Sequence, residues 1–370
     1  MIRGWAAAPD GRHHGAHHTD AARHLGARPG GFLDFSANIN SLGPPEAALA
    51  AGKEALYGEA GRYPDLHYTD LSVALAGYLG VPAQTVLPTN GGAEALFLAA
   101  RTAADGPARK AIVLEPTFSE YATAARAAGF EVASVVARRP ETGFRLDLSI
   151  LESALEEWDD AGLVFLCNPN NPTGDALPRQ EMLRAAEMVR EAGAVLVVDE
   201  AFVDFAPGSS VAAEAAEGLY VARSFTKFFA VPGLRLGCLV CPEPSRVRAF
   251  QPSWPVNAVA AAVGIAAVRD EDFAKATLAE VTSRRVELLD MLNELPGITA
   301  YPGAANFLLM WGPEGLVEGL ARRGILVRSC EPFRGLGPGF FRVAVRGAGE
   351  NGRLVGELRL VLRGRIGAPT

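Results

Sequence analysis

Short apolar segments alternate with helical segments from about Glu46 to about Pro242. We expect strands at 111–114, 131–136, 163–167 and 194–199, and helices at 119–128, 148–158 and 179–192. Continuous apolar runs such as 163–167 are typical of strands that are buried on both faces of a parallel sheet. The alternation therefore predicts the α/β class, with a mostly parallel sheet covered by helices on both faces.

The remainder of the chain, from about Glu243, has a different pattern. We expect a long helical stretch at 258–292, strands at 306–311, 325–329 and 340–345, and a helix at 351–362. This order predicts a smaller α+β domain. A chain of 370 residues with 49% hydrophobic content is long enough to form two such cores.

Charge and cysteine content narrow the class of protein. The net charge of −7 and the isoelectric point near 5.5 argue against nucleic-acid or anionic-membrane partners. The cysteines Cys167, Cys238, Cys241 and Cys330 lack a second pair that would complete a zinc site, so we expect buried, reduced thiols in a cytoplasmic protein. We expect no signal peptide, and no apolar stretch approaches the ~20 residues that a membrane span needs.

Lys227 is the most informative single residue, because the chain has only four lysines among its 35 basic residues. It lies in the largely apolar segment 221–237, next to a predicted strand. A lysine amine that loses its hydration there has a lowered pKa and becomes a nucleophile toward carbonyl groups. A lysine that extends its amine to the surface explains Lys227 alone equally well.

Three other segments decide between these interpretations. Asp199 ends the buried strand 194–199, where a carboxylate can serve a ligand above the carboxyl edge of the sheet. The loop Asn168-Pro-Asn-Asn-Pro-Thr-Gly follows another buried strand, and its two prolines and glycine restrict its path. Gly91 and Gly92 open a helix whose N–H groups and dipole can bind a phosphate.

In this order and spacing, the four segments resemble the fold-type I, aspartate aminotransferase-like enzymes of pyridoxal 5′-phosphate over nearly the whole chain. The resemblance implies that Lys227 attaches the cofactor aldehyde covalently, that Asp199 keeps the pyridine nitrogen protonated, and that Asn171 hydrogen-bonds the ring oxygen. It also implies a large domain at 46–242, and a small domain formed by 1–45 together with 243–370.

Further residues are implied to bind the cofactor. The phosphate would be held by Gly91, Gly92, Ser224, Thr226 and Arg235, the last through its planar guanidinium. Phe118 would stack on the ring, although packing in the core explains this aromatic residue when it is taken alone.

Within this family, the chain resembles the L-threonine-O-3-phosphate decarboxylases of cobalamin biosynthesis. The segments that carry this likeness are 32–45, with its Asp-Phe-Ser-Ala-Asn-Ile-Asn string, and Arg62-Tyr-Pro-Asp. Phe202 stands where the related histidinol-phosphate aminotransferases usually carry tyrosine. The resemblance implies a lyase that releases carbon dioxide from the phosphorylated amino acid and yields (R)-1-aminopropan-2-yl phosphate.

The substrate carries a carboxylate and a phosphate, and arginines fit both. By resemblance, Arg346 corresponds to the arginine that binds the α-carboxylate, while Arg328 and His14 bind the phosphate. Arginines that only cap a sheet edge are the alternative. Arg342 shares a strand face with Arg346 by its even spacing, and its part in the site stays open.

Two further expectations concern metal and assembly. Five of the six histidines fall between His13 and His24, but no cysteine or carboxylate cluster accompanies them, so we expect no metal site. In the family, the tyrosine of Arg-Tyr-Pro-Asp reaches the cofactor phosphate of the partner, so we expect a homodimer with Tyr63 at its interface.

Alternative functions remain at this point. A histidinol-phosphate or related aminotransferase shares the cofactor and the site, and no motif records which bond of the substrate is broken. A cofactor-binding regulator would need an added basic DNA-binding module, for which this chain has neither the length nor the charge.

Overall fold

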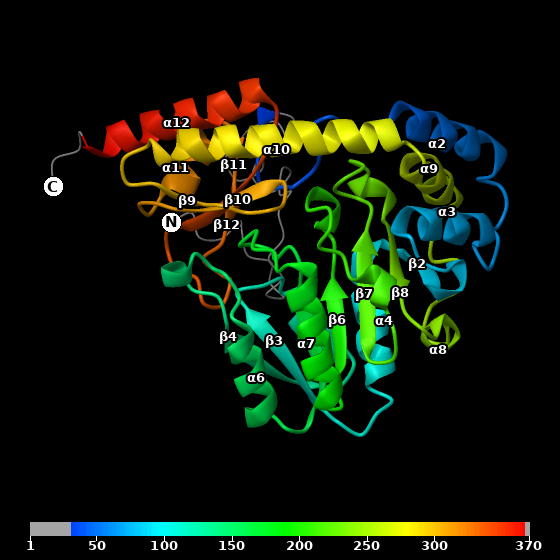
Figure 1. Cartoon of the computed structure of the whole chain (residues 1–370). Coiled ribbons are helices and arrows are strands. Elements are labelled where there is room, and N and C mark those ends of the chain that lie inside the picture. The colour runs from blue at the N-terminus through cyan, green and yellow to red at the C-terminus, as the bar shows by residue number, and fades with distance from the viewer. Residues whose placement is uncertain (1–30, 367–370) are drawn as a thin grey trace.

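The computed structural model describes residues 31–366. Its centre is a seven-stranded sheet in which β8 alone runs antiparallel to both of its neighbours (Figure 1). In spatial order the strands are β2 (Val86–Asn90), β8 (Leu236–Val240), β7 (Leu219–Ser224), β6 (Val195–Asp199), β5 (Ala161–Cys167), β3 (Lys110–Glu115) and β4 (Glu131–Val136). The mostly parallel sheet predicted from the sequence is confirmed.

Helices cover both faces of this sheet, as the sequence predicts. One face carries α4 (Gly91–Ala103) and α5 (Glu120–Ala127), and the other carries α6 (Leu148–Glu157) and α7 (Arg179–Glu191) (Figure 1). Successive strand residues enter different cores: Val197 packs with the α4 and α5 side, while Leu196 and Val198 pack with the other side.

A cluster of helices extends the large core beside the sheet. It consists of α2 (Glu46–Gly58), α3 (Thr69–Leu79) and α9 (Ala258–Val268), and the short α8 (Pro244–Arg248) lies below it. Gly52 of α2 allows the close approach of α9, because a Cβ there would lie 2.7 Å from Val263 Cγ2. Buried residues of α9 thus share a core with the large sheet. The predicted domain boundary at residue 242 stays a prediction.

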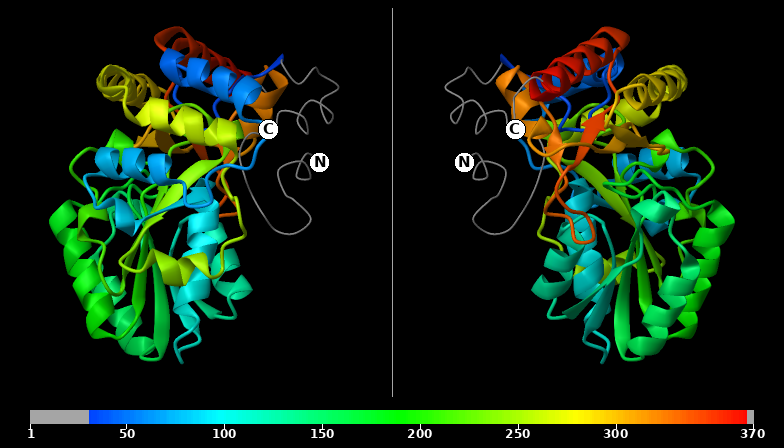
Figure 2. Two further views of the ribbon diagram at one scale, coloured as in Figure 1. Left: turned by 90° about the vertical axis from the view of Figure 1, so that its right-hand side faces the viewer. Right: turned by 90° about the vertical axis from the view of Figure 1, so that its left-hand side faces the viewer.

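A second, smaller sheet lies above the first, under the long helices (Figures 1 and 2). Its antiparallel strands are, in order, β12 (Arg328–Ser329), β13 (Phe340–Ala344), β10 (Phe307–Trp311) and β9 (Thr299–Tyr301). The covering helices are α10 (Glu271–Asn293), α11 (Leu316–Arg322) and α12 (Ala348–Ile366). The N-terminal β1 (Leu33–Asp34) pairs in parallel with β11 (Ile325–Leu326), which ties the start of the described chain to this region.

Two expected elements are divided in the structure. The helical stretch expected at 258–292 is interrupted, because the Asp270 carboxylate accepts from the Phe273 amide at 2.9 Å and starts a new helix there. The strand expected at 325–329 is split, because 325–326 pairs with β1 whereas 328–329 pairs with β13. Among residues 31–366, no helix is both long and apolar enough to cross a membrane.

Candidate active site

The Lys227 amine lies just beyond the carboxyl end of β7, in a largely enclosed position. Nζ donates to Ser224 Oγ at 3.0 Å and lies 5.5 Å from the centre of the Phe202 ring. Burial lowers the pKa of the Lys227 amine, the cations Arg235 and Arg342 lower it further, and Asp199 opposes them. This is the chemistry of a nucleophilic amine rather than of a surface lysine.

Asp199 is buried at the carboxyl end of β6. Its Oδ1 accepts from the Ala201 amide at 2.9 Å, and its Oδ2 accepts from the Tyr121 hydroxyl at 2.7 Å. Burial raises the pKa of Asp199, while the nearby Lys227 amine and these hydrogen bonds lower it. A buried carboxylate held in this way can pair with a protonated nitrogen above the sheet edge.

The start of α4 is a cradle of closely packed groups that has no room for side chains on its two glycines. Gly91 has φ +76°, and a Cβ there would lie 2.8 Å from Arg235 Nη2. A Cβ on Gly92 would lie 3.2 Å from Ser224 Cβ. Ser224 Oγ and Thr226 Oγ1 are 2.9 Å apart. Bare amides at a helix N-terminus, a guanidinium and two hydroxyls together fit a phosphate group.

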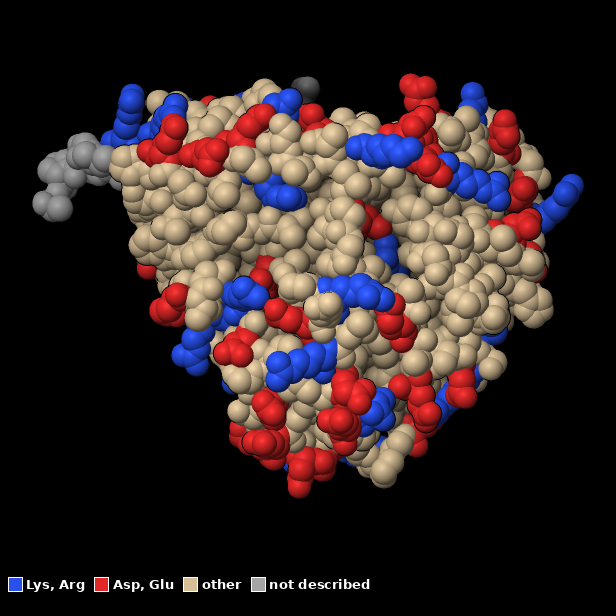
Figure 3. Space-filling model, in the orientation of Figure 1, with Lys and Arg blue, Asp and Glu red and all other residues tan. Residues whose placement is uncertain are grey.

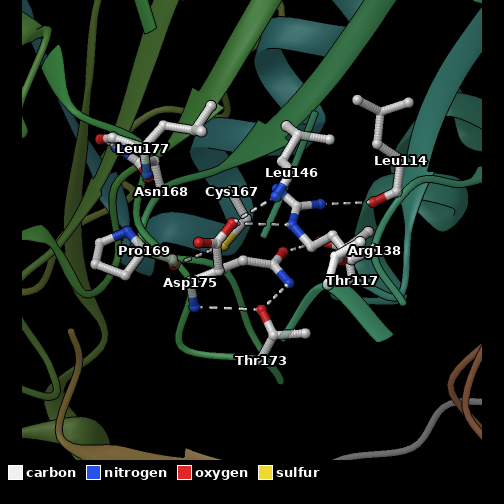
Figure 4. Close-up of polar contacts among 12 residues, drawn as sticks. Leu114, Thr117, Arg138, Leu146, Cys167, Asn168, Pro169, Thr173, Asp175 and Leu177 are labelled. Atoms are coloured by element: carbon white, nitrogen blue, oxygen red, sulfur yellow. Dashed lines mark hydrogen bonds and ion pairs between the residues drawn. The ribbon is translucent and has the colours of Figure 1, made fainter. Parts of the chain in front are cut away.

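The loop after β5 is held by its own asparagines. Asn168 exchanges two hydrogen bonds with Leu177, at 3.1 and 2.8 Å (Figure 4). Asn170 donates to Pro116 O and Thr173 Oγ1 at 3.0 and 2.8 Å. Asn171, by contrast, accepts from Arg342 Nη1. Asn168 and Asn170 therefore hold the loop in place, whereas Asn171 contacts an arginine of the small sheet.

A buried arginine pair is the main cationic feature of that small sheet. Arg342 of β13 donates to Ser36 O at 3.1 Å as well as to Asn171, and its guanidinium lies 4.9 Å from the centre of the Phe307 ring. Arg328 of β12 is its direct partner across the two strands.

Burial of both arginines is electrostatically unfavourable. Burial lowers the pKa of Arg342 to about 10, with Arg328 contributing, and it also lowers the pKa of Arg328. Directly opposed like charges destabilise a sheet. An anionic ligand would reduce that cost, and a guanidinium pair can bind a carboxylate or a phosphate.

Arg346 lies beyond the end of β13 and is engaged differently. Its Nη2 pairs with Glu350 at 2.8 Å, and its Nη1 donates to Asp34 O at 3.2 Å. The structure thus places Arg342, rather than Arg346, next to Asn171. Even spacing signals that the two arginines share a strand face, but the sequence does not show that the strand ends at Ala344.

The remaining predicted site residues fall in three places. Phe118 is half-buried and meets the ring of Tyr121 edge-on at 5.7 Å. Tyr63 is 80% exposed and stacks on Trp254 at 4.4 Å, which suits a contact with another subunit better than one within its own site. His14, with the rest of the histidine cluster, lies outside the described residues.

Two residues of this site were not assigned from the sequence, namely Tyr121 and Arg342. No local signal marks Tyr121, since a tyrosine on an amphipathic helix is typical of a core. Phe202, which the sequence singled out, packs edge-on against Phe307 at 5.0 Å and presents its ring to Lys227. Residue 202 therefore presents an apolar ring, rather than a tyrosine hydroxyl, to the Lys227 amine.

Sequence comparison with known proteins places the chain in a family of enzymes. Residues 31–358 match the family model for aminotransferase class I and II. The threonine-phosphate decarboxylase of Salmonella typhimurium is 39% identical over 95% of this chain and 97% of its own length. The histidinol-phosphate aminotransferase of Methanosarcina mazei is 31% identical over 91% of this chain and 90% of its own.

Solved structures show the same fold. The L-threonine-O-3-phosphate decarboxylase of Porphyromonas gingivalis superposes with a TM-score of 0.77 at 25% identity, covering 90% of this chain and 99% of its own. The histidinol-phosphate aminotransferase of Sinorhizobium meliloti, solved in complex with pyridoxal 5′-phosphate, gives a TM-score of 0.81 at 22% identity, with 94% of each chain covered.

Proposed function

The chain belongs to the aminotransferase class I and II family, and we propose that it decarboxylates L-threonine-O-3-phosphate to (R)-1-aminopropan-2-yl phosphate for cobalamin biosynthesis. The 39% identity to a threonine-phosphate decarboxylase over almost the full length of both chains carries this proposal. Phe202 beside Lys227 supports it, because a tyrosine is expected there in the related aminotransferases.

The residues present fit pyridoxal 5′-phosphate as the cofactor. Lys227 would attach it covalently, Asp199 would pair with its ring nitrogen and Asn171 would bind its ring oxygen. Its phosphate would lie in the cradle formed by Gly91, Gly92, Ser224, Thr226 and Arg235, and Phe118 would cover the ring. When bound, the cofactor supplies an electron sink conjugated to the α-carbon of the substrate.

The chain's own groups bind and orient the substrate and handle its proton. The Lys227 amine would donate a proton to the α-carbon that loses its carboxylate. Its lowered pKa suits an amine that must change protonation state during turnover. Phe202 and Phe307 shield this region from water with apolar rings.

The arginine pair of the small sheet would hold the two anionic groups of the substrate. We assign the α-carboxylate to Arg342, because the Arg346 guanidinium, predicted for that role, is engaged by Glu350 and Asp34. Arg328, with His14 from the N-terminal segment, would hold the phosphate. Loss of the phosphate leaves a buried cation without its ligand, which costs about 2–5 kcal/mol.

A homodimer is part of the proposal. Large hydrophobic side chains are exposed on and around α2 and α3. In Figure 3, acidic and basic side chains gather along the top and in the lower half, and a broad area between them lacks such side chains. The exposed side chains are Leu42, Leu49, Leu56, Tyr57, Tyr63, Leu66, Val73 and Trp254. Exposed hydrophobic side chains that form a contiguous patch are typical of an interface, so we place the dimer contact at these helices. A cytoplasmic location stays a prediction, to which four free, buried cysteines add support.

Product analysis tests the proposed reaction. With L-threonine-O-3-phosphate the protein should release carbon dioxide and form aminopropanol phosphate, without a 2-oxo acid as acceptor. Free L-threonine should be at least about thirty-fold poorer in kcat/KM, from the loss of the phosphate contacts. Transamination of histidinol phosphate with 2-oxoglutarate, without carbon dioxide from threonine phosphate, would show instead that the chain is an aminotransferase.

A further inference from the structure

The Tyr121 hydroxyl is a buried donor that reaches the site from α5. The tyrosine is fully enclosed, and its ring stacks on Phe165 at 5.2 Å with planes 10° apart. Phe118 also meets the ring, edge-on, at 5.7 Å. Two aromatic contacts therefore fix the ring, so the position of its hydroxyl follows from the packing of the helix on the sheet.

Asp199 receives this donor in addition to one from its own turn. The Tyr121 hydroxyl donates to Oδ2 at 2.7 Å and the Ala201 amide donates to Oδ1 at 2.9 Å. Because the donors come from two separate elements and reach different oxygens, they fix the plane of the carboxylate. Without Tyr121, the carboxylate could rotate about its Cβ–Cγ bond while it kept the Ala201 bond.

We infer that Tyr121 is a positioning residue, which holds the Asp199 carboxylate ionised and in the orientation that meets the ring nitrogen of the cofactor. This inference rests on the proposed role of Asp199. It assigns to the stacked tyrosine a function that core packing alone does not require, since a phenylalanine would fill the same space.

The other titratable groups around Asp199 support this assignment. Cys167 is the register partner of Asp199 on β5, and its thiol donates to Pro169 O at 3.2 Å. Burial raises the pKa of the Cys167 thiol to about 12 and raises that of Tyr121 well above its ordinary value, so both are neutral near pH 7. The Lys227 amine lowers the pKa of Asp199 by its electrostatic influence.

Behind Cys167 lies a further charge. The buried guanidinium of Arg138 donates to Leu114 O at 3.2 Å, and its Nε lies 3.6 Å from Asp175 Oδ2 (Figure 4). Its charge favours the ionised form of Cys167, but burial has the larger effect on the pKa of that thiol. Tyr121 therefore acts on Asp199 as a neutral hydrogen-bond donor rather than as a charge.

Substitution Tyr121→Phe tests the inference, because it removes the hydroxyl and keeps the stacked ring. The matched control is Tyr78→Phe, which removes a hydroxyl that donates to another carboxylate, Asp204 Oδ1, at 3.0 Å. Both variants should lose a similar amount of thermal stability. Only Tyr121→Phe should bind pyridoxal 5′-phosphate more weakly, by about ten-fold in Kd measured by equilibrium dialysis of the cofactor-free protein.

The pH dependence gives a second readout that structural damage would not shift. The Tyr121 bond lowers the pKa of Asp199, so its removal raises that pKa, and the carboxylate charge is then lost at a higher pH as the pH falls. The midpoint of the pH-dependent change in the visible absorbance of the bound cofactor should therefore lie about one pH unit higher in Tyr121→Phe than in the unmodified protein. A shift of about one unit corresponds to the ten-fold change expected in Kd.

A double-mutant cycle completes the test. In the Asp199→Asn background, Tyr121→Phe should have no more than about a twofold effect on cofactor affinity, since the carboxylate it serves is gone. An unchanged affinity and pH profile in Tyr121→Phe, or a full ten-fold effect in the Asp199→Asn background, would overturn the inference. Failure of the unmodified protein to bind pyridoxal 5′-phosphate would instead refute the proposed function itself.

Discussion

Substitution Arg342→Gln is the most direct probe of how this site holds its substrate. The Arg342 guanidinium is enclosed, donates to Asn171 and Ser36, and lies opposite Arg328. Glutamine keeps part of the side chain and one donor group but removes the charge. Any anionic group bound by Arg342 therefore loses a charge-assisted, bidentate partner.

The expected magnitude follows from burial. Breaking a desolvated charge contact costs about 2–5 kcal/mol. This corresponds to a fall of roughly thirty-fold to several thousand-fold in kcat/KM for L-threonine-O-3-phosphate. The folded protein should not lose comparable stability, because the substitution also removes the repulsion between two buried cations that are direct partners across β12 and β13.

The matched variant is Arg346→Gln, which removes a half-buried ion pair with Glu350. Such pairs contribute at most about 1 kcal/mol. Carbon dioxide release should therefore fall much less in Arg346→Gln than in Arg342→Gln, while urea unfolding shows both proteins folded. A larger loss of kcat/KM in Arg346→Gln would refute the assignment of the carboxylate to Arg342 and restore the role predicted from the sequence.

Other outcomes follow from single residues. Lys227→Ala should abolish activity. Borohydride reduction of the unmodified protein with pyridoxal 5′-phosphate should leave the cofactor permanently attached to Lys227, and attachment to another lysine would refute its role. Asp199→Asn should keep the cofactor but lower turnover by orders of magnitude, whereas near-normal turnover would disconnect this carboxylate from the chemistry. Sedimentation should give a dimer, and Tyr63→Ala should weaken cofactor binding; a fully active monomer at assay concentration would contradict both. Burial raises the pKa of Glu115 from 4.5 to about 7, so the free energy of unfolding should fall by about 3 kcal/mol as the pH rises through that range. Glu115→Gln should make the free energy of unfolding depend less on pH. An unchanged pH dependence in chemical denaturation between pH 5 and 8 would contradict this.

The sequence predicts the large sheet well, because its strands are continuous apolar runs separated by helices of ordinary length. It predicts the small region less well. A two-residue strand such as β12 carries no periodicity of its own, and its partner is set by tertiary packing. For the same reason, the part that Arg342 plays could not be decided from spacing, since both arginines fit one face of an extended strand until the end of that strand is known.

The register of the central strands brings residues that are far apart in the sequence together at the cofactor cradle. Asp199 is the register partner of Cys167 on one side and of Ala222 on the other, and Ser224 faces Gly237 across β7 and β8. A one-residue slip of β6 would carry the Asp199 carboxylate to the opposite face of the sheet, away from Tyr121.

Gly237 completes the arrangement from β8. A Cβ at this position would lie 2.5 Å from both Gly91 C and Gly92 N, and 2.7 Å from Arg223 O. These atoms belong to the backbone and cannot turn aside, so only glycine lets the start of α4 approach the sheet edge. The motifs around Lys227, Asp199 and the paired glycines are thus one structural unit. The register of β5, β6, β7 and β8, together with the absence of a side chain at Gly237, brings the amine, the carboxylate and the helix N-terminus together.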